Sequence, residues 1–68
     1  MKPVSGKSMA KSLKARGWVH VRTKGSHFQF DHPDFPGIIP VPVHGNRDLR
    51  TGTQKDIMRQ AGLRDSDL

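Results

Sequence analysis

Hydrophobic and polar residues follow a helical spacing at both ends of this chain and alternate in between. Near the N-terminus, Met9 and Leu13 are four positions apart and fall on one face of a helix. Ser5 is suited to cap the start of this helix, and Gly17 can end it in the left-handed conformation. The pattern therefore predicts a first helix from Ser5 to Arg16, with one apolar face and a basic opposite face.

Two strands follow, over Trp18–Thr23 and Ser26–Asp31, because apolar and polar residues alternate in both segments. Lys24 and Gly25 between them form the expected two-residue hairpin turn, in which Gly25 takes the positive φ that such a turn requires. The two segments are therefore expected to pair as an antiparallel hairpin.

The register of this hairpin assigns each side chain to a face of the sheet. Val21 is expected opposite Phe28 on the apolar face, which also holds Val19. Arg22 is expected opposite His27 on the other face. An arginine is thus the predicted cross-strand neighbour of this histidine.

A third strand is expected over Ile38–Val43, where Pro40 and Pro42 limit how the strand can pair. Prolines two residues apart remove N–H donors from the same side of a strand, so this strand belongs at a border of the sheet. The second strand is then central, between the first and the third.

The last predicted element is a helix that begins near Thr51, where Thr51 and Gln54 resemble a capping box. Thr53 with Asp56 offers a weaker alternative start. Gly62 ends this helix, and its apolar face is formed by Ile57, Met58 and Ala61.

Together these elements predict an α+β fold in the order α-β-β-β-α, with a three-stranded antiparallel sheet. Each helix and the sheet has one apolar face, so the simplest burial packs both helices on one face of the sheet and leaves the other open. The 68 residues fit one small domain, 1–68, in which the polar residues 64–68 are expected to fray.

Charge adds information about the partner. Twelve Lys and Arg against six Asp and Glu give a formal net charge of +6, which favours a polyanion such as RNA. The alternative is a charged surface that serves solubility alone. No cysteine is present for a disulfide or a thiolate zinc site. No segment has the apolar length of a signal peptide or a membrane span, so we expect a cytoplasmic protein without a membrane partner.

His27 closely follows the predicted turn at Gly25 and is expected as an exposed imidazole on a basic sheet. A ribonuclease that uses no metal can activate the RNA 2′-hydroxyl against the adjacent phosphate, which requires a base, an acid and cations. His27 can serve as either the base or the acid. The candidate RNA- and phosphate-binding residues are Arg22, Lys24, Ser26, Gln29 and His44, and the more loosely assigned ones are Arg47, Arg50 and Lys55.

The other histidines have more ordinary interpretations. His20 is expected on the strand surface, and His32 is expected to shape the following loop. His44 is either a loop-forming hydrogen-bonding residue or a catalytic assistant. The four histidines lack a compact ligand spacing and nearby carboxylates, so neither a metal nor another cofactor is expected. Trp18 is expected to pack at the end of the first helix.

A series of short motifs spans nearly the whole chain, from Ser5 to Leu63. The series comprises Gly17-Trp18, Arg22, Lys24-Gly25-Ser26-His27, His32-Pro33, Val41-Pro42-Val43-His44-Gly45, Gly52-Thr53, Ile57 and Gln60-Ala61-Gly62. In order and spacing it resembles the HicA toxin family. The resemblance implies a double-stranded-RNA-binding-like fold, the role of toxin in a type II toxin–antitoxin system, and a metal-independent mRNA interferase activity. It also implies inhibition by a cognate HicB antitoxin, and it maps the family's catalytic histidine onto His27.

Two other functions stay open at this point. The same basic surface suits a non-catalytic RNA-binding module, and it also suits a protein that only recruits an acidic partner. RNA that is bound but never cut in EDTA favours the first, and absence of RNA affinity at low salt favours the second.

Overall fold

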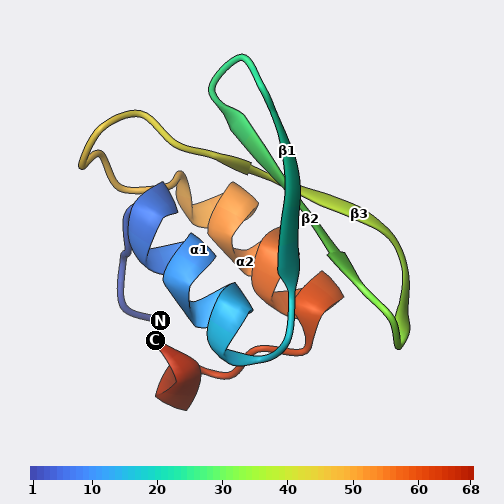
Figure 1. The fold of residues 1–68 in the computed structure, drawn as a ribbon. Helices are drawn as coiled ribbons and strands as arrows, with labels where there is room; N and C mark the ends of the chain where they lie inside the picture. The colour runs from blue at the N-terminus through green and yellow to red at the C-terminus, as the bar shows by residue number, and fades with distance from the viewer.

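The structure, a computed structural model, describes all residues from 1 to 68 and has the predicted order of elements. The elements are α1 (Gly6–Ala15), β1 (Val19–Lys24), β2 (His27–His32), β3 (Phe35–Pro42), α2 (Thr51–Ala61) and the short 3-10 helix η1 (Asp65–Asp67). The strands form one antiparallel sheet in the order β1-β2-β3, and both helices lie against the same face of it (Figure 1). This arrangement confirms the predicted α+β architecture and agrees with a double-stranded-RNA-binding-like fold.

The ends of α1 are those that the sequence predicts. The Ser5 side chain caps the helix, because its Oγ accepts a hydrogen bond from the Ser8 amide at 3.1 Å. Gly17 follows the helix with a φ of +91°, a conformation that favours glycine. No helix in the structure has both the length and the apolar character needed to cross a membrane.

One cluster of 13 buried hydrophobic residues fills the space between the helices and the sheet. Leu13 of α1, Phe30 of β2 and Ile57 of α2 show the three surfaces that meet there. Trp18 is buried at the end of α1, which confirms its expected packing role. The apolar face that the sequence predicts for each helix therefore packs against the core.

The strand β3 is at the border of the sheet, as its prolines predict. The amide of Val43, just beyond the strand, donates to Ser26 O at 2.8 Å and thus faces β2. The backbone nitrogens of even-numbered residues in β3 point away from β2. Those of Pro40 and Pro42 therefore lie along the free edge of the sheet, where no hydrogen-bond donor is needed.

The register predicted for the first hairpin is wrong. The turn consists of Gly25 and Ser26, not of Lys24 and Gly25, and Lys24 pairs with His27. Gly25 has a φ of +60° and Ser26 does not have a positive φ, which matches a turn that requires glycine at its first central position. Arg22 consequently lies opposite Gln29 instead of His27.

A β-bulge at Val21 also reverses the faces in the first half of β1. The register shifts between His20 and Arg22, and the extra residue changes which side chains point to the core. Val19 and Val21 are therefore 56% and 45% exposed instead of buried. His20, expected on the open surface, lies on the apolar side and stacks on Phe28 with ring centroids 4.5 Å apart.

The start of α2 differs from the predicted capping box. The helix begins at Thr51 after Arg50, which makes no side-chain capping hydrogen bond. Gln54 is instead only 1% exposed. Its Oε1 accepts from the Val4 amide at 3.1 Å, and its Nε2 donates to Lys2 O at 2.6 Å. A buried amide needs such partners, and the segment before α1 supplies them. Gly62 ends α2 with a φ of +68°, as predicted.

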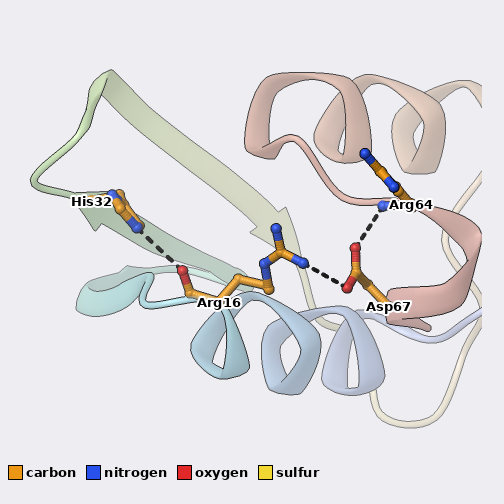
Figure 2. Close-up of polar contacts among 4 residues, drawn as sticks. All are labelled: Arg16, His32, Arg64 and Asp67. Carbon is orange, nitrogen blue, oxygen red and sulfur yellow. Dashed lines mark hydrogen bonds and ion pairs between the residues drawn. The ribbon is translucent and has the colours of Figure 1, made fainter.

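Residues 64–68, expected to fray, are instead folded back onto the end of α1. Asp67 in η1 accepts a hydrogen bond from Arg16 at 2.9 Å and one from the Arg64 amide at 2.7 Å (Figure 2). The Arg64 amide, helped by the charge of Arg16, lowers the pKa of the Asp67 carboxyl from its usual value, against an opposing desolvation. One local and one long-range hydrogen bond thus hold a segment whose composition gives no sign of order.

Candidate functional site

A surface hollow of about 500 Å³ lies where the start of β2 meets the segment between β3 and α2. His27 lines it from β2 and Pro42 from β3. The connecting segment and the start of α2 supply the other lining residues, which are His44, Arg47, Asp48, Leu49, Arg50 and Thr53. The hollow therefore joins His27 to residues that are far away in the sequence.

The sheet fixes the position of His27. It pairs with Lys24 of β1 on one side and with Pro42 of β3 on the other, so it is flanked in the central strand. Its side chain is exposed, while the next residue, Phe28, packs against the core. Alternation along the strand thus anchors the backbone and leaves the imidazole facing solvent.

Contacts to the N-terminal segment hold the opposite wall of the hollow. The amide of Leu49 donates to Val4 O at 2.8 Å, and Ser5 forms an isolated antiparallel bridge with Asp48. Leu49 is also part of the buried core. The segment is therefore tied down at residues 48 and 49, between Arg47 and Arg50.

The charge in the hollow is predominantly positive. Arg47 and Arg50 contribute two guanidinium groups, and Asp48 is the one acidic residue in the lining. The first turn of α2 contains no acidic residue. Two histidines at the same place can add charge or transfer protons. The arrangement suits a phosphate, for which arginine is a preferred ligand.

The four histidines fall into two groups. In His32, Nδ1 accepts a hydrogen bond from the Asp34 amide at 3.0 Å, so the other nitrogen, Nε2, donates to Arg16 O at 3.2 Å (Figure 2). This confirms that His32 shapes the loop. His20 lies 2.9 Å from the Thr23 hydroxyl through its Nε2. His27 and His44 are exposed and line the hollow together.

The fold brings only some of the site residues predicted from the sequence together. His27 and His44 share the hollow, and Lys24 pairs with His27. Arg22 and Gln29 pair with each other two residues further along the hairpin, beyond Thr23 and Phe28, and do not line the hollow. Ser26 lies in the turn before His27, where its carbonyl accepts a hydrogen bond from the amide of Val43, just beyond β3.

Four lining residues had no candidate role in the sequence: Pro42, Asp48, Leu49 and Thr53. The loosely assigned Arg47 and Arg50 prove to be the arginines nearest to this site, whereas Lys55 does not line it. No periodic pattern marks the segment from 43 to 50, so only its cluster of charges indicated a role. No three His, Asp or Glu residues come together in the structure as a metal-binding group.

The sequence model of the HicA toxin of bacterial toxin–antitoxin systems matches residues 6–63 of the chain. The chain belongs to the HicA toxin family. A search among curated proteins finds no significant match. Family membership supports a role as the toxin of such a system, and it implies an antitoxin partner. The match begins at the first residue of α1 and ends just after α2, so this HicA chain carries the family sequence through both helices and the sheet.

Proposed function

We propose that this HicA chain is an mRNA interferase, a toxin endoribonuclease that uses His27 and needs no metal. The observation that carries the proposal is the placement of His27 and His44 in one hollow with Arg47 and Arg50. Two imidazoles and two guanidinium groups are the parts that cleavage through the RNA 2′-hydroxyl requires, namely a base, an acid and anion ligands.

In the proposed reaction, the His27 imidazole removes the proton of the 2′-hydroxyl. The 2′-oxygen then forms a bond to the adjacent phosphorus, and the bond from phosphorus to the 5′-oxygen breaks. His44 gives a proton to this departing oxygen, so the products are a 2′,3′-cyclic phosphate and a 5′-hydroxyl. The negative charge that gathers on the phosphorane oxygens is stabilised by Arg47 and Arg50.

Lys24 assists at the edge of this site. It is the cross-strand partner of His27, and its ammonium group can pair with a phosphate of the bound strand. Arg22 with Gln29 forms the next pair on the same face of the hairpin, where they can contact a more distant nucleotide. Ser26, in the turn beside them, adds a hydroxyl to the same end of the sheet.

The regulatory partner in this proposal is a HicB-like antitoxin in the cytoplasm. Because His27 is exposed, a protein that covers it blocks access of RNA to the hollow. Expression of the chain alone is expected to arrest bacterial growth. Co-expression with an adjacent HicB-like gene is expected to restore growth, and persistent arrest argues against this pairing.

The direct test uses purified protein, labelled RNA and EDTA. The His27→Ala variant is expected to cut RNA about 10²- to 10⁴-fold more slowly than wild type, the range for loss of one general acid–base group. Thr51→Ala is the control, because Thr51 is exposed on α2 and lines no part of the hollow. A folded His27→Ala protein that cuts as fast as wild type refutes the proposal. RNA that binds in a salt-dependent way but is never cut identifies a non-catalytic RNA-binding module instead.

A further inference from the structure

A second hollow of about 450 Å³ adjoins the first along β3 and α2. The two share His27, Pro42 and Thr53, so together they form one continuous depression. The lining that belongs to the second hollow alone comprises Ile39, Pro40, Gly52, Asp56, Ile57 and Gln60. Its volume is in the range of small-ligand sites, about 300–1,000 Å³.

The second hollow differs from the first in charge. No lysine or arginine lines it, whereas two arginines line the first hollow. Pro40, Pro42 and the two isoleucines give it apolar walls, and Asp56 with Gln60 gives it one polar edge. Apart from His27 and Thr53, which it shares with the first hollow, its lining offers a phosphate no ligand. A flat, uncharged group with hydrogen-bonding atoms on its rim suits it better, and a nucleobase is such a group.

The polar edge is oriented by hydrogen bonds on α2. Gln60 Nε2 donates to Asp56 Oδ2 at 2.8 Å. A carboxylate only accepts hydrogen bonds, so the amide nitrogen must face it, and Gln60 Oε1 remains as an acceptor. Asp56 also forms an ion pair with the Arg59 guanidinium, which offsets the charge of the carboxylate beside an RNA strand.

Gly52 keeps the second hollow open without being required by the fold. Its φ is not positive, and a Cβ on Gly52 meets no other atom within 4 Å. Neither backbone conformation nor packing therefore calls for glycine, which is a poor helix former. Any side chain at this position adds atoms at the wall of the hollow.

We propose that the second hollow is a nucleobase subsite, which takes the base of a nucleotide adjacent to the phosphate in the first hollow. Gln60 Oε1 accepts a hydrogen bond from an exocyclic amino group of that base, so cytosine binds in preference to uracil. The location of the phosphate rests on the proposed function, but base binding can be measured without cleavage.

The test measures the affinity of fluorescent 2′-O-methyl hexacytidylate and hexauridylate by anisotropy. These strands lack the attacking hydroxyl, so binding is observed alone. Wild type is expected to bind hexacytidylate about three- to tenfold more tightly, the effect of one hydrogen bond. Gln60→Ala should remove this preference, and Gly52→Ala should weaken the binding of both oligonucleotides. Thr51→Ala should behave as wild type, because Thr51 is on the same helix but lines neither hollow.

The outcomes separate this inference from the proposed function. Equal affinity of wild type for the two strands, or an unchanged preference in Gln60→Ala, overturns the subsite even where wild type cuts ordinary RNA. A cytosine preference that depends on Gln60 supports the subsite, and it does so even if no RNA is cut in EDTA. Absence of binding to either strand overturns the subsite.

Discussion

Lys24 lies directly opposite His27 in the hairpin of β1 and β2, at the position where the alternation of the sequence predicted Arg22. A lysine offers a single, mobile point charge, whereas an arginine offers a planar fork for bidentate contact. A mobile charge can follow a phosphate group as the bond order at phosphorus changes. The cation next to the proposed catalytic histidine is therefore of a different kind from the one expected.

Lys24→Ala is predicted to reduce the initial rate of RNA cleavage about fivefold, because one exposed charge contributes on the order of 1 kcal/mol. Arg22→Ala, two residues further along β1 on the same face, should have a smaller effect. Raising the salt concentration should narrow the difference between Lys24→Ala and wild type, since exposed charges are screened. A larger loss in Arg22→Ala than in Lys24→Ala contradicts this order.

Gly6→Ala is predicted to destabilise the fold by separating α1 from β3. A Cβ at Gly6 would lie 2.0 Å from Pro42 O, and the obstructing atom is backbone. Overpacking of this kind costs about 1–3 kcal/mol, which urea denaturation monitored by circular dichroism measures. Gly52→Ala is the matched control, because a Cβ there meets nothing. Equal stability of Gly6→Ala and wild type argues against this close approach.

The order of elements could be predicted because each one carries a local signal. Ser5 and Gly17 mark the ends of α1, and two prolines mark β3 as a border strand. The faces of β1 could not be predicted in the same way. One inserted residue at Val21 reverses which side chains of β1 face the core, and valine at that position does not indicate a bulge.

The candidate site was only partly predictable, for a related reason. His27 follows a recognisable turn and stands in a regular strand, so local reasoning reached it. Arg47 and Arg50 are in an irregular segment that is held by long-range contacts, such as the bond from the Leu49 amide to Val4 O. Contacts between residues so far apart in the sequence produce no periodic pattern from which they could be predicted.

Asp67→Asn is predicted to make unfolding less sensitive to acid. The pKa of the folded carboxyl is lowered from 3.8, so its stabilising effect is complete above that value and is lost as the pH falls through the folded pKa. The difference in unfolding free energy between wild type and Asp67→Asn should stay constant from about pH 7 to 5 and shrink below about pH 4. Urea denaturation at each pH measures it.

The cause of this effect can be tested separately. The Arg64 amide is the largest cause of the lowered pKa, and the charge of Arg16 adds to it. Arg16→Ala should therefore raise the pKa of Asp67 only partway to its usual value, as followed by an NMR titration of the carboxyl carbon. A complete return to the usual value would mean that Arg16 is the main cause.

His44→Ala is predicted to slow RNA cleavage because the departing 5′-oxygen then lacks its proton donor. The expected loss is about 10²-fold or more, as for other general acids. A substrate with sulfur in place of that oxygen needs no proton to depart, so it should restore most of the rate of His44→Ala. The same substrate should not rescue His27→Ala, which lacks the base for the 2′-hydroxyl. Equal rescue of both variants, or of neither, contradicts the separate roles of the two histidines that share the hollow.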